Sequence, residues 1–219
     1  METTDLAQKL DTIFKGFDYS VSHFAYLLHQ SAMGPFFDGL FSFITWFGEN
    51  GVLVVLLSIV LLLFKKTKRI GVTILVSVIV STFIANILIK HAVGRQRPYI
   101  NEGSPYYPWW LDIAHGAERE IFSFPSGHTT VTFSAMTSLF MTGNKKYVWY
   151  GYLFAVLMGF SRIYLMVHYA SDVVGGAVIG IALGAAVSAA LKELYRKKFF
   201  PWRHKKKAPS VSADKIKHT

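Results

Sequence analysis

The 219-residue sequence contains no cysteine, and this absence removes several kinds of chemistry from consideration. The chain has no disulfide framework, no cysteine-based metal site and no thiol nucleophile. Charged residues are also sparse, at 16% of the chain, whereas a soluble domain carries about 25%. A hydrophobic content of 52%, gathered in long apolar runs, indicates instead an integral membrane protein.

Acidic residues are the scarcer charged kind: 13 Asp and Glu stand against 23 Lys and Arg, which gives a net charge of +10. This excess does not indicate a nucleic-acid partner, because much of it lies at the ends of apolar runs, where membrane topology requires it. The first twenty residues do not resemble a signal peptide, since acidic residues interrupt them. We therefore expect the lipid bilayer as partner, and neither nucleic acid nor an obligate protein partner.

The apolar runs predict six transmembrane helices, at residues 21–47, 52–64, 70–89, 127–141, 147–162 and 169–191. Gly34-Pro35 interrupts the first of them, which indicates either a kink or a span that starts late. The sixth carries many alanines and has Gly176, Gly180 and Gly184 at four-residue spacing, the pattern of a close-packing helix face.

The segments outside these spans complete the expected organisation. Residues 1–20 are polar with apolar residues at helical spacing, which fits either an amphipathic helix on the membrane surface or a solvated helix packed on the bundle. Residues 91–125 form a long loop whose Trp and Tyr residues suit the headgroup layer, and residues 192–219 form a basic tail. The sequence therefore predicts an all-α integral membrane protein whose six-helix domain occupies residues 21–191.

The distribution of cations predicts the orientation in the membrane. Six spans place both termini on one side, together with the basic turns at 65–69 and 145–146, and the positive-inside rule makes that side cytoplasmic. We expect a multi-pass plasma-membrane protein whose 91–125 loop is extracytoplasmic. Several outward cations run against the rule and need a local reason, which a bound anion supplies; they are Lys90, Arg95, Arg97, Arg119 and Arg162.

The stretch SRIYLMVHYASD carries ionisable residues between two long apolar runs. His168 and Asp172 are four residues apart, so on a helix they share one face. A carboxylate in that position holds an imidazole in one tautomer and makes it more nucleophilic. By itself, the stretch also fits a structural histidine–aspartate pair beside Arg162 as an interfacial cation.

Two further stretches, KHAVGRQRP and PSGH, lie at outer ends of predicted spans. Lys90 and Arg97 offer a point charge and a planar fork that match phosphate oxygens, although snorkelling interfacial cations follow the same pattern. Ser126 is a good N-cap, and Gly127 lets an anion approach the amides of the helix N-terminus. His128 follows them, where a general acid would be needed; a capped helix with an interfacial histidine is the alternative.

Together the three stretches predict a phosphate site at the outer boundary of the membrane. It would combine three cations, a helix N-terminus and two histidines, one of them paired with a carboxylate. Phosphoryl transfer needs positioning and charge neutralisation more than covalent help, so we expect no metal and no cofactor. Zinc binding by His168 and Asp172 is the weaker alternative, because three neighbouring cations would repel a divalent ion.

The stretches match K-x6-R-P, P-S-G-H and S-R-x5-H-x3-D, and in this combination the chain resembles the type-2 phosphatidic acid phosphatases, the membrane lipid phosphate phosphatases. It is most similar to the bacterial phosphatidylglycerophosphatase B type. The resemblance implies that His168 attacks phosphorus to form a phosphohistidine, that Asp172 orients it, and that His128 protonates the leaving oxygen and then activates water. It also implies that the phosphoryl oxygens are held by Lys90, Arg97, Ser126, Gly127 and Arg162.

The resemblance makes phosphatidylglycerol phosphate the first choice of substrate, with phosphatidylglycerol as product. Undecaprenyl pyrophosphate is a close rival, and phosphatidic acid and its lyso form are further candidates, because the motif residues recognise only the shared phosphoryl group. An anion or lipid transporter is an alternative of another class, but it predicts broken spans with charges near the midplane, whereas the charges here lie at span ends. A membrane scaffold is a further alternative, but it leaves the motif positions unexplained. The roles of Glu118, Arg119 and Glu120, near the predicted site, stay open.

Overall fold

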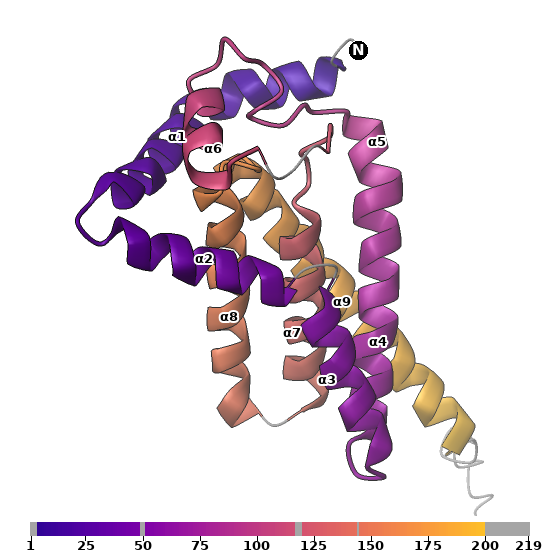
Figure 1. Ribbon diagram of the computed structural model, residues 1–219. Coiled ribbons are helices and arrows are strands. Elements are labelled where there is room, and N and C mark those ends of the chain that lie inside the picture. Colours follow the sequence, from indigo (N-terminus) through magenta and orange to yellow (C-terminus); the bar gives the residue numbers. More distant parts are fainter. Residues whose placement is uncertain (1–3, 49–50, 117–119, 144, 200–219) are drawn as a thin grey trace, which may run out of the picture.

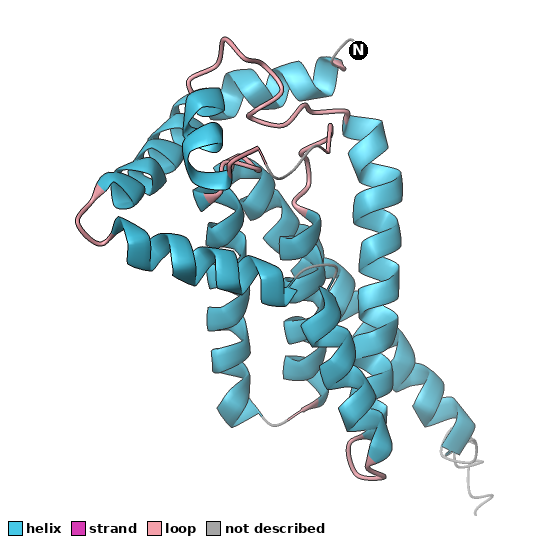
Figure 2. Ribbon diagram, viewed as in Figure 1, coloured by secondary structure: helices cyan, strands magenta, loops and turns pink. Residues whose placement is uncertain are grey.

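The structure is a computed structural model that describes residues 4–48, 51–116, 120–143 and 145–199. Glu118, Arg119 and residues 200–219 of the basic tail lie outside these ranges. Within them every regular element is a helix, which confirms the predicted all-α fold for this part of the chain (Figure 2). The elements are α1 (Asp5–Gln30), α2 (Gly34–Gly48), α3 (Val52–Leu63), α4 (Lys68–Thr82), the π-helical η2 (Phe83–Ile89), α5 (Lys90–Val93), α6 (Tyr106–Ala114), α7 (Gly127–Thr142), α8 (Lys145–Tyr164) and α9 (Ala170–Phe199).

Helix α7 is the centre of the bundle, with α4, α8 and α9 packed around it (Figure 1). Its buried residues are mostly small and hydroxyl-bearing, so neighbouring helices approach closely. A Cβ added to Gly180 of α9 would lie 2.4 Å from the carbonyl oxygen of Thr130. One added to Gly184 would lie 2.4 Å from the carbonyl oxygen of Ser134. The predicted close-packing glycine face of the last helix is therefore confirmed, and its partner is α7.

Two helical runs among the described residues are long and apolar enough to cross a membrane: 68–93, which joins α4, η2 and α5, and 170–196 in α9. Helices α2 and α3 pass the same test as a pair, but they are bent by 50° at their junction, as in a broken span or a re-entrant loop. Helix α7 has 16 residues, fewer than the roughly 20 that cross a bilayer, and it is enclosed by protein. The structure thus identifies two or three of the six predicted spans.

The predicted first span, 21–47, is divided between two helices. Helix α1 continues to Gln30, the chain turns, and α2 begins at Gly34. The turn is so tight that a Cβ on Gly34 would lie 1.9 Å from the carbonyl oxygen of His29. Pro35 stands in the first turn of α2, where a missing amide hydrogen costs nothing. The Gly-Pro pair therefore marks a full break rather than a kink within one helix.

One end of the bundle, where α5 and α8 end and α7 and α9 begin, lies beneath α1 and α6 (Figure 1). Helix α6 belongs to the predicted 91–125 loop, which is folded against the bundle. Aromatic residues of this 91–125 segment contribute to the core: the rings of Tyr99 and Trp110 are buried, and their centroids are 4.4 Å apart. These two rings pack against protein, whereas the sequence had favoured the headgroup layer. The three motif stretches all reach this end.

Candidate active site

His168 and Asp172 meet where the chain enters α9. His168 Nδ1 lies 3.6 Å from Asp172 Oδ2, and the two side chains are 1% and 0% exposed. The same Oδ2 accepts hydrogen bonds from the Tyr169 amide, at 2.9 Å, and from the Ser123 hydroxyl. Because Nδ1 faces the carboxylate, the opposite ring nitrogen, Nε2, is turned away from it. The structure thus brings together the pair that the four-residue spacing predicted.

The backbone between α8 and α9 holds His168 close to Arg162. The Arg162 carbonyl oxygen accepts hydrogen bonds from the amides of Val167 and His168, each at 3.2 Å. Met166 reverses the chain with a left-handed backbone (φ 54°), a conformation that non-glycine residues adopt rarely and mostly where the surroundings demand it. The Arg162 side chain is 1% exposed, so this cation is enclosed by protein.

The start of α7 is tied directly to the histidine–aspartate pair. The Ser126 amide donates to the backbone carbonyl of Asp172 at 3.1 Å. Ser126 occupies the N-cap position as predicted, but its side chain makes no capping bond; its hydroxyl instead accepts from Thr129 Oγ1 at 2.9 Å. Gly127 admits Asn86 of η2, because a Cβ there would lie 2.3 Å from Asn86 Oδ1.

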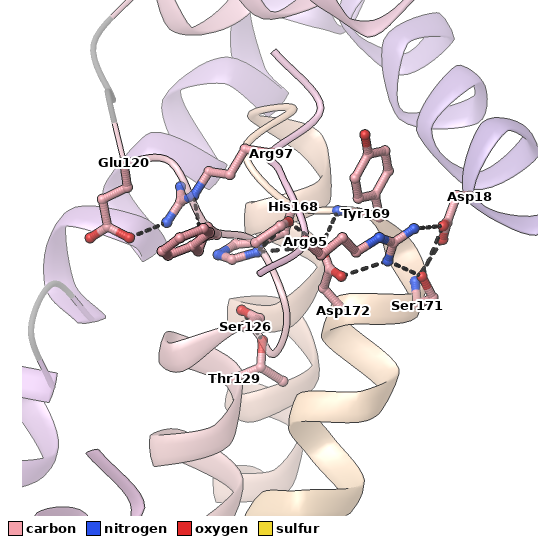
Figure 3. A network of polar contacts seen from close by, with 12 residues as sticks. Asp18, Arg95, Arg97, Glu120, Ser126, Thr129, His168, Tyr169, Ser171 and Asp172 are labelled. Carbon is pink, nitrogen blue, oxygen red and sulfur yellow. Dashed lines mark hydrogen bonds and ion pairs between the residues drawn. The ribbon is translucent and has the colours of Figure 1, made fainter. Parts of the chain in front are cut away.

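Lys90 and Arg97 converge on a single carboxylate, that of Glu120 (Figure 3 shows the Arg97 contact). Lys90 Nζ donates to Glu120 Oε2 at 2.8 Å, and Arg97 Nη2 donates to the same oxygen. Burial alone would raise the pKa of the Glu120 carboxyl, but the Lys90 hydrogen bond and the two positive charges outweigh it and lower the pKa to about 2. An oxyanion thus already stands between the two predicted phosphate ligands.

These groups surround a cavity of about 690 Å³. Its lining also includes η2, the junction of α2 and α3, and residues 120–122. Five predicted site residues line it: Lys90, Arg97, Gly127, His128 and His168. The other three are buried behind the lining: Ser126, Arg162 and Asp172. A histidine that faces a carboxylate, a second histidine and two cations therefore share one cavity, the arrangement that phosphoryl transfer to histidine requires.

Sequence reasoning missed the contacts of Arg95, which it treated only as one of several outward cations. Its guanidinium is 1% exposed and donates to Asp172 Oδ1 at 2.7 Å, to Asp18 Oδ2 at 2.8 Å and to Asp11 Oδ1 at 2.7 Å. Burial would lower the pKa of Arg95, but the three carboxylates raise it above its usual value. The signal in the sequence was weak: Asp11 and Asp18 are seven residues apart, hence on one face of α1.

A protein-family model described as the PAP2 superfamily matches residues 70–196. The chain belongs to the PAP2 superfamily. The match runs from α4 to α9 and contains the three motif stretches and the cavity residues at 90–97, 127–128 and 168.

Individual relatives of this PAP2 protein are phosphatases by name. An undecaprenyl-diphosphatase of Sulfolobus acidocaldarius is 30% identical over 65% of this chain and 65% of its own length. Phosphatidylglycerophosphatase B of Bacillus subtilis is 29% identical over 76% of this chain and 79% of its own length. The crystal structure of the B. subtilis transmembrane PAP2 type phosphatidylglycerolphosphate phosphatase resembles this fold with a TM-score of 0.63, at 25% identity, over 86% of this chain and 92% of that one. These names support a phosphoric monoester hydrolase and a membrane protein.

Proposed function

We propose that this PAP2 protein is a membrane lipid phosphatase that hydrolyses the phosphate monoester of phosphatidylglycerol phosphate through a phosphohistidine. The observation that carries the proposal is the placement of His168, His128, Lys90 and Arg97 around one cavity, with Asp172 against Nδ1 of His168. That carboxylate keeps the proton of the neutral imidazole on Nδ1 and leaves the lone pair on Nε2 for attack.

In the first step, His168 Nε2 forms a bond to phosphorus as the bond to the lipid oxygen breaks. His128 donates a proton to that oxygen, so the product leaves as a neutral alcohol, phosphatidylglycerol. In the second step, His128 accepts a proton from water, whose oxygen attacks phosphorus and releases inorganic phosphate. The imidazole of His168 is thereby restored. We assign the nucleophilic role to His168 because its Nδ1 faces the Asp172 carboxylate, and the proton-transfer role to His128, which lines the same cavity.

The phosphoryl oxygens gain charge density in both transition states and need fixed positive partners. Lys90 and Arg97 line the cavity and would take two of these oxygens, with the amides at Gly127 on the helix N-terminus as further donors. Ser126 and Arg162 complete the proposed phosphate-binding set from behind the lining. Glu120 lies between the two cations, where we propose that the phosphate binds, and would leave when substrate enters.

The proposed setting is the plasma membrane, with six spans, both termini in the cytoplasm and the cavity at the extracytoplasmic face. The short α7 would cross as part of the bundle rather than as a lipid-facing helix. A single Glu102→Cys substitution tests the orientation cleanly, because the chain has no other cysteine and this side chain is exposed. We expect labelling by a membrane-impermeant maleimide from outside intact cells. Labelling from the cytoplasmic side alone would reverse the orientation.

Undecaprenyl pyrophosphate is the second candidate substrate, favoured by the archaeal relative's name. The discriminating measurement is phosphate release by purified protein from phosphatidylglycerol phosphate, undecaprenyl pyrophosphate and phosphatidic acid under matched detergent conditions. We expect the highest kcat/KM on phosphatidylglycerol phosphate. A higher kcat/KM on undecaprenyl pyrophosphate would make that lipid the substrate instead.

The nucleophile is tested by His168→Ala, which we expect to abolish release of phosphate and trapping of an acid-labile, base-stable phosphoenzyme. The matched control is His115→Asn at an exposed histidine whose left-handed backbone (φ 50°) asparagine tolerates. Phosphate release by His168→Ala equal to that of the control would remove His168 from the mechanism. Complete inhibition by a chelator would instead favour a metal-dependent reaction.

A further inference from the structure

The Arg95 guanidinium is buried and contacts Asp172, the carboxylate that faces the proposed nucleophile His168 (Figure 3). Its Nη1 donates to both Asp172 Oδ1 and Ser171 Oγ at 2.7 Å, and its Nη2 donates to Asp18 Oδ2 at 2.8 Å. The guanidinium also lies 4.1 Å from the centroid of the Tyr169 ring, which covers one face of it. A planar fork held on its edges and on one face has little freedom to rotate.

The two oxygens of Asp172 have separate partners. Oδ1 accepts from Arg95, whereas Oδ2 accepts from Ser123 and the Tyr169 amide and faces His168 Nδ1. Arg95 therefore sets the rotation of the carboxylate without touching the face that the histidine uses. A buried carboxylate that lost this partner would lose both its compensating charge and the hydrogen bond that holds Oδ1 in place.

Asp18 of α1 links this arginine to the backbone of α9. Its Oδ1 accepts from the Ser171 amide at 2.7 Å, and its Oδ2 accepts from Ser171 Oγ and from Arg95 Nη2, each at 2.8 Å. The Ser171 amide belongs to the first turn of α9, where amides have no partner within the helix. Asp18 thus caps from another helix the turn that carries Asp172. It is 1% exposed, although α1 lies at the surface of the bundle.

We propose that Arg95 and Asp18 are positioning residues for the nucleophile: they hold the Asp172 carboxylate in the rotation that orients His168. This inference rests on the proposed phosphohistidine mechanism and adds a contribution from α1, which lies outside the matched PAP2 region. Neither residue lines the cavity among the described residues, and the guanidinium of Arg95 already donates to Asp172, Ser171 and Asp18. We therefore expect neither residue to hold the phosphoryl group. Loss of either should slow phosphoryl transfer to His168 and leave phosphate binding unchanged.

The test compares Arg95→Gln, Arg95→Lys and Asp18→Asn with wild type. Asp5→Asn is the matched control for Asp18→Asn, because it removes the same negative charge at an exposed position on α1. Measurements on phosphatidylglycerol phosphate in detergent would give kcat, KM, the vanadate inhibition constant, and the rate and amplitude of phosphoenzyme formation after rapid quenching. We expect kcat to fall about 10–100-fold for Arg95→Gln and Asp18→Asn, the scale seen when orienting partners of a reactive group are removed. Arg95→Lys keeps the positive charge but not the planar fork, so its kcat should lie between those of wild type and Arg95→Gln.

Two further measurements distinguish a positioning role from other roles: the affinity for ligands, and the number of active sites given by the phosphoenzyme amplitude. We expect KM and the vanadate inhibition constant of the Arg95 and Asp18 variants to stay near wild type, with full phosphoenzyme amplitude formed at a reduced rate. A parallel rise of the vanadate constant would make Arg95 a phosphate ligand and overturn the inference. So would a reduced amplitude at an unchanged rate, which would mean that the variants contain fewer folded sites.

The combined variant Arg95→Lys/Asp18→Asn provides an independent check. If both residues act through Asp172, their losses in kcat should be non-additive, with a combined loss smaller than the product of the single losses. Fully multiplicative losses would contradict a shared route. A wild-type protein that turns over lipid phosphate without forming a phosphohistidine would refute the proposed function, whereas normal phosphoenzyme kinetics in the Arg95 and Asp18 variants would refute this inference alone.

Discussion

Arg95 and Arg97 are separated by one residue, yet they lie on either side of His168 and have opposite surroundings (Figure 3). Arg95 is enclosed by carboxylates, and its Asp18 partner has a side chain only 2% exposed. Arg97 meets Glu120, whose side chain is 64% exposed. Arg97 itself is as buried as Arg95, at 2% exposed, so the difference lies in the carboxylates. Breaking a pair in which both partners are buried costs several kcal/mol, whereas a largely exposed carboxylate can move into solvent at a smaller cost. The first arrangement is suited to permanent support, and the second to exchange with an anionic ligand.

The local backbone of the KHAVGRQRP stretch does not account for the different surroundings of the two arginines. Gly94 ends α5 with a left-handed backbone (φ 61°), and the chain beyond it is extended through a bridge between Gln96 and Phe122. In extended backbone, residues two apart would normally share a side. The opposed surroundings of the two arginines therefore come from the bundle, which offers carboxylates of α1 and α9 to one guanidinium and Glu120 to the other.

The largest expected effect in this comparison comes from Arg97→Gln. Loss of a charged donor to the phosphoryl oxygens should lower kcat/KM by about 10²–10³-fold, as for the loss of other preorganised donors. The vanadate inhibition constant should rise with it, in contrast to Arg95→Gln. Steady-state kinetics with vanadate competition measure both quantities. An unchanged vanadate constant in Arg97→Gln would mean that the two arginines do not divide binding and support in this way.

A smaller effect of opposite sign is expected for Glu120→Gln. Removing the carboxylate that occupies the space between Lys90 and Arg97 should lower KM and the vanadate constant by roughly three- to tenfold, since the Glu120 side chain is 64% exposed and solvent weakens its ion pairs. The matched change at the other pair, Asp18→Asn, should leave KM unchanged and lower kcat. A raised KM in Glu120→Gln would show that the glutamate holds the cations in place for the phosphate.

The smallest effect concerns pH: we expect the reduction of KM by Glu120→Gln to be independent of pH. The pKa of the Glu120 carboxyl is lowered from 4.5 to about 2, so its ion pairs are fully formed above pH 4.5 and are lost only as the pH falls through about 2. The ratio of wild-type KM to Glu120→Gln KM should therefore be constant from roughly pH 5 to 8. The substrate titrates equally in both assays and cancels from the ratio. A ratio that approached one at pH 5 would mean that the carboxyl takes up its proton in that range.

The chemistry-bearing residues were predictable because their signal is local. His168 and Asp172 are four residues apart and Ser126 and Gly127 start a helix, so both motifs are visible in short stretches of sequence. The pair meets although His168 lies in the turn before α9 rather than on the helix that the spacing predicted. Helices α3, α7 and α8 begin and end within two residues of the predicted spans for the same reason: apolar runs, glycines and basic turns mark them. Helix α6 lies in the predicted loop, and α9 continues to Phe199, beyond the predicted end at 191. The glycine face of α9 was equally readable, since four-residue spacing needs no knowledge of the partner.

The sequence by itself therefore determined the helical class, the three motif stretches and the resemblance to lipid phosphate phosphatases. Only the tertiary structure decided the break at Gly34, the position of Glu120 between two cations and the contacts of Arg95. The Arg95–Asp18 pair joins residues 77 apart, and its members belong to segments that the sequence separated into a surface helix and a loop. Periodicity reports which face of an element is apolar, but it carries no information about which charges from distant elements meet once those faces are buried.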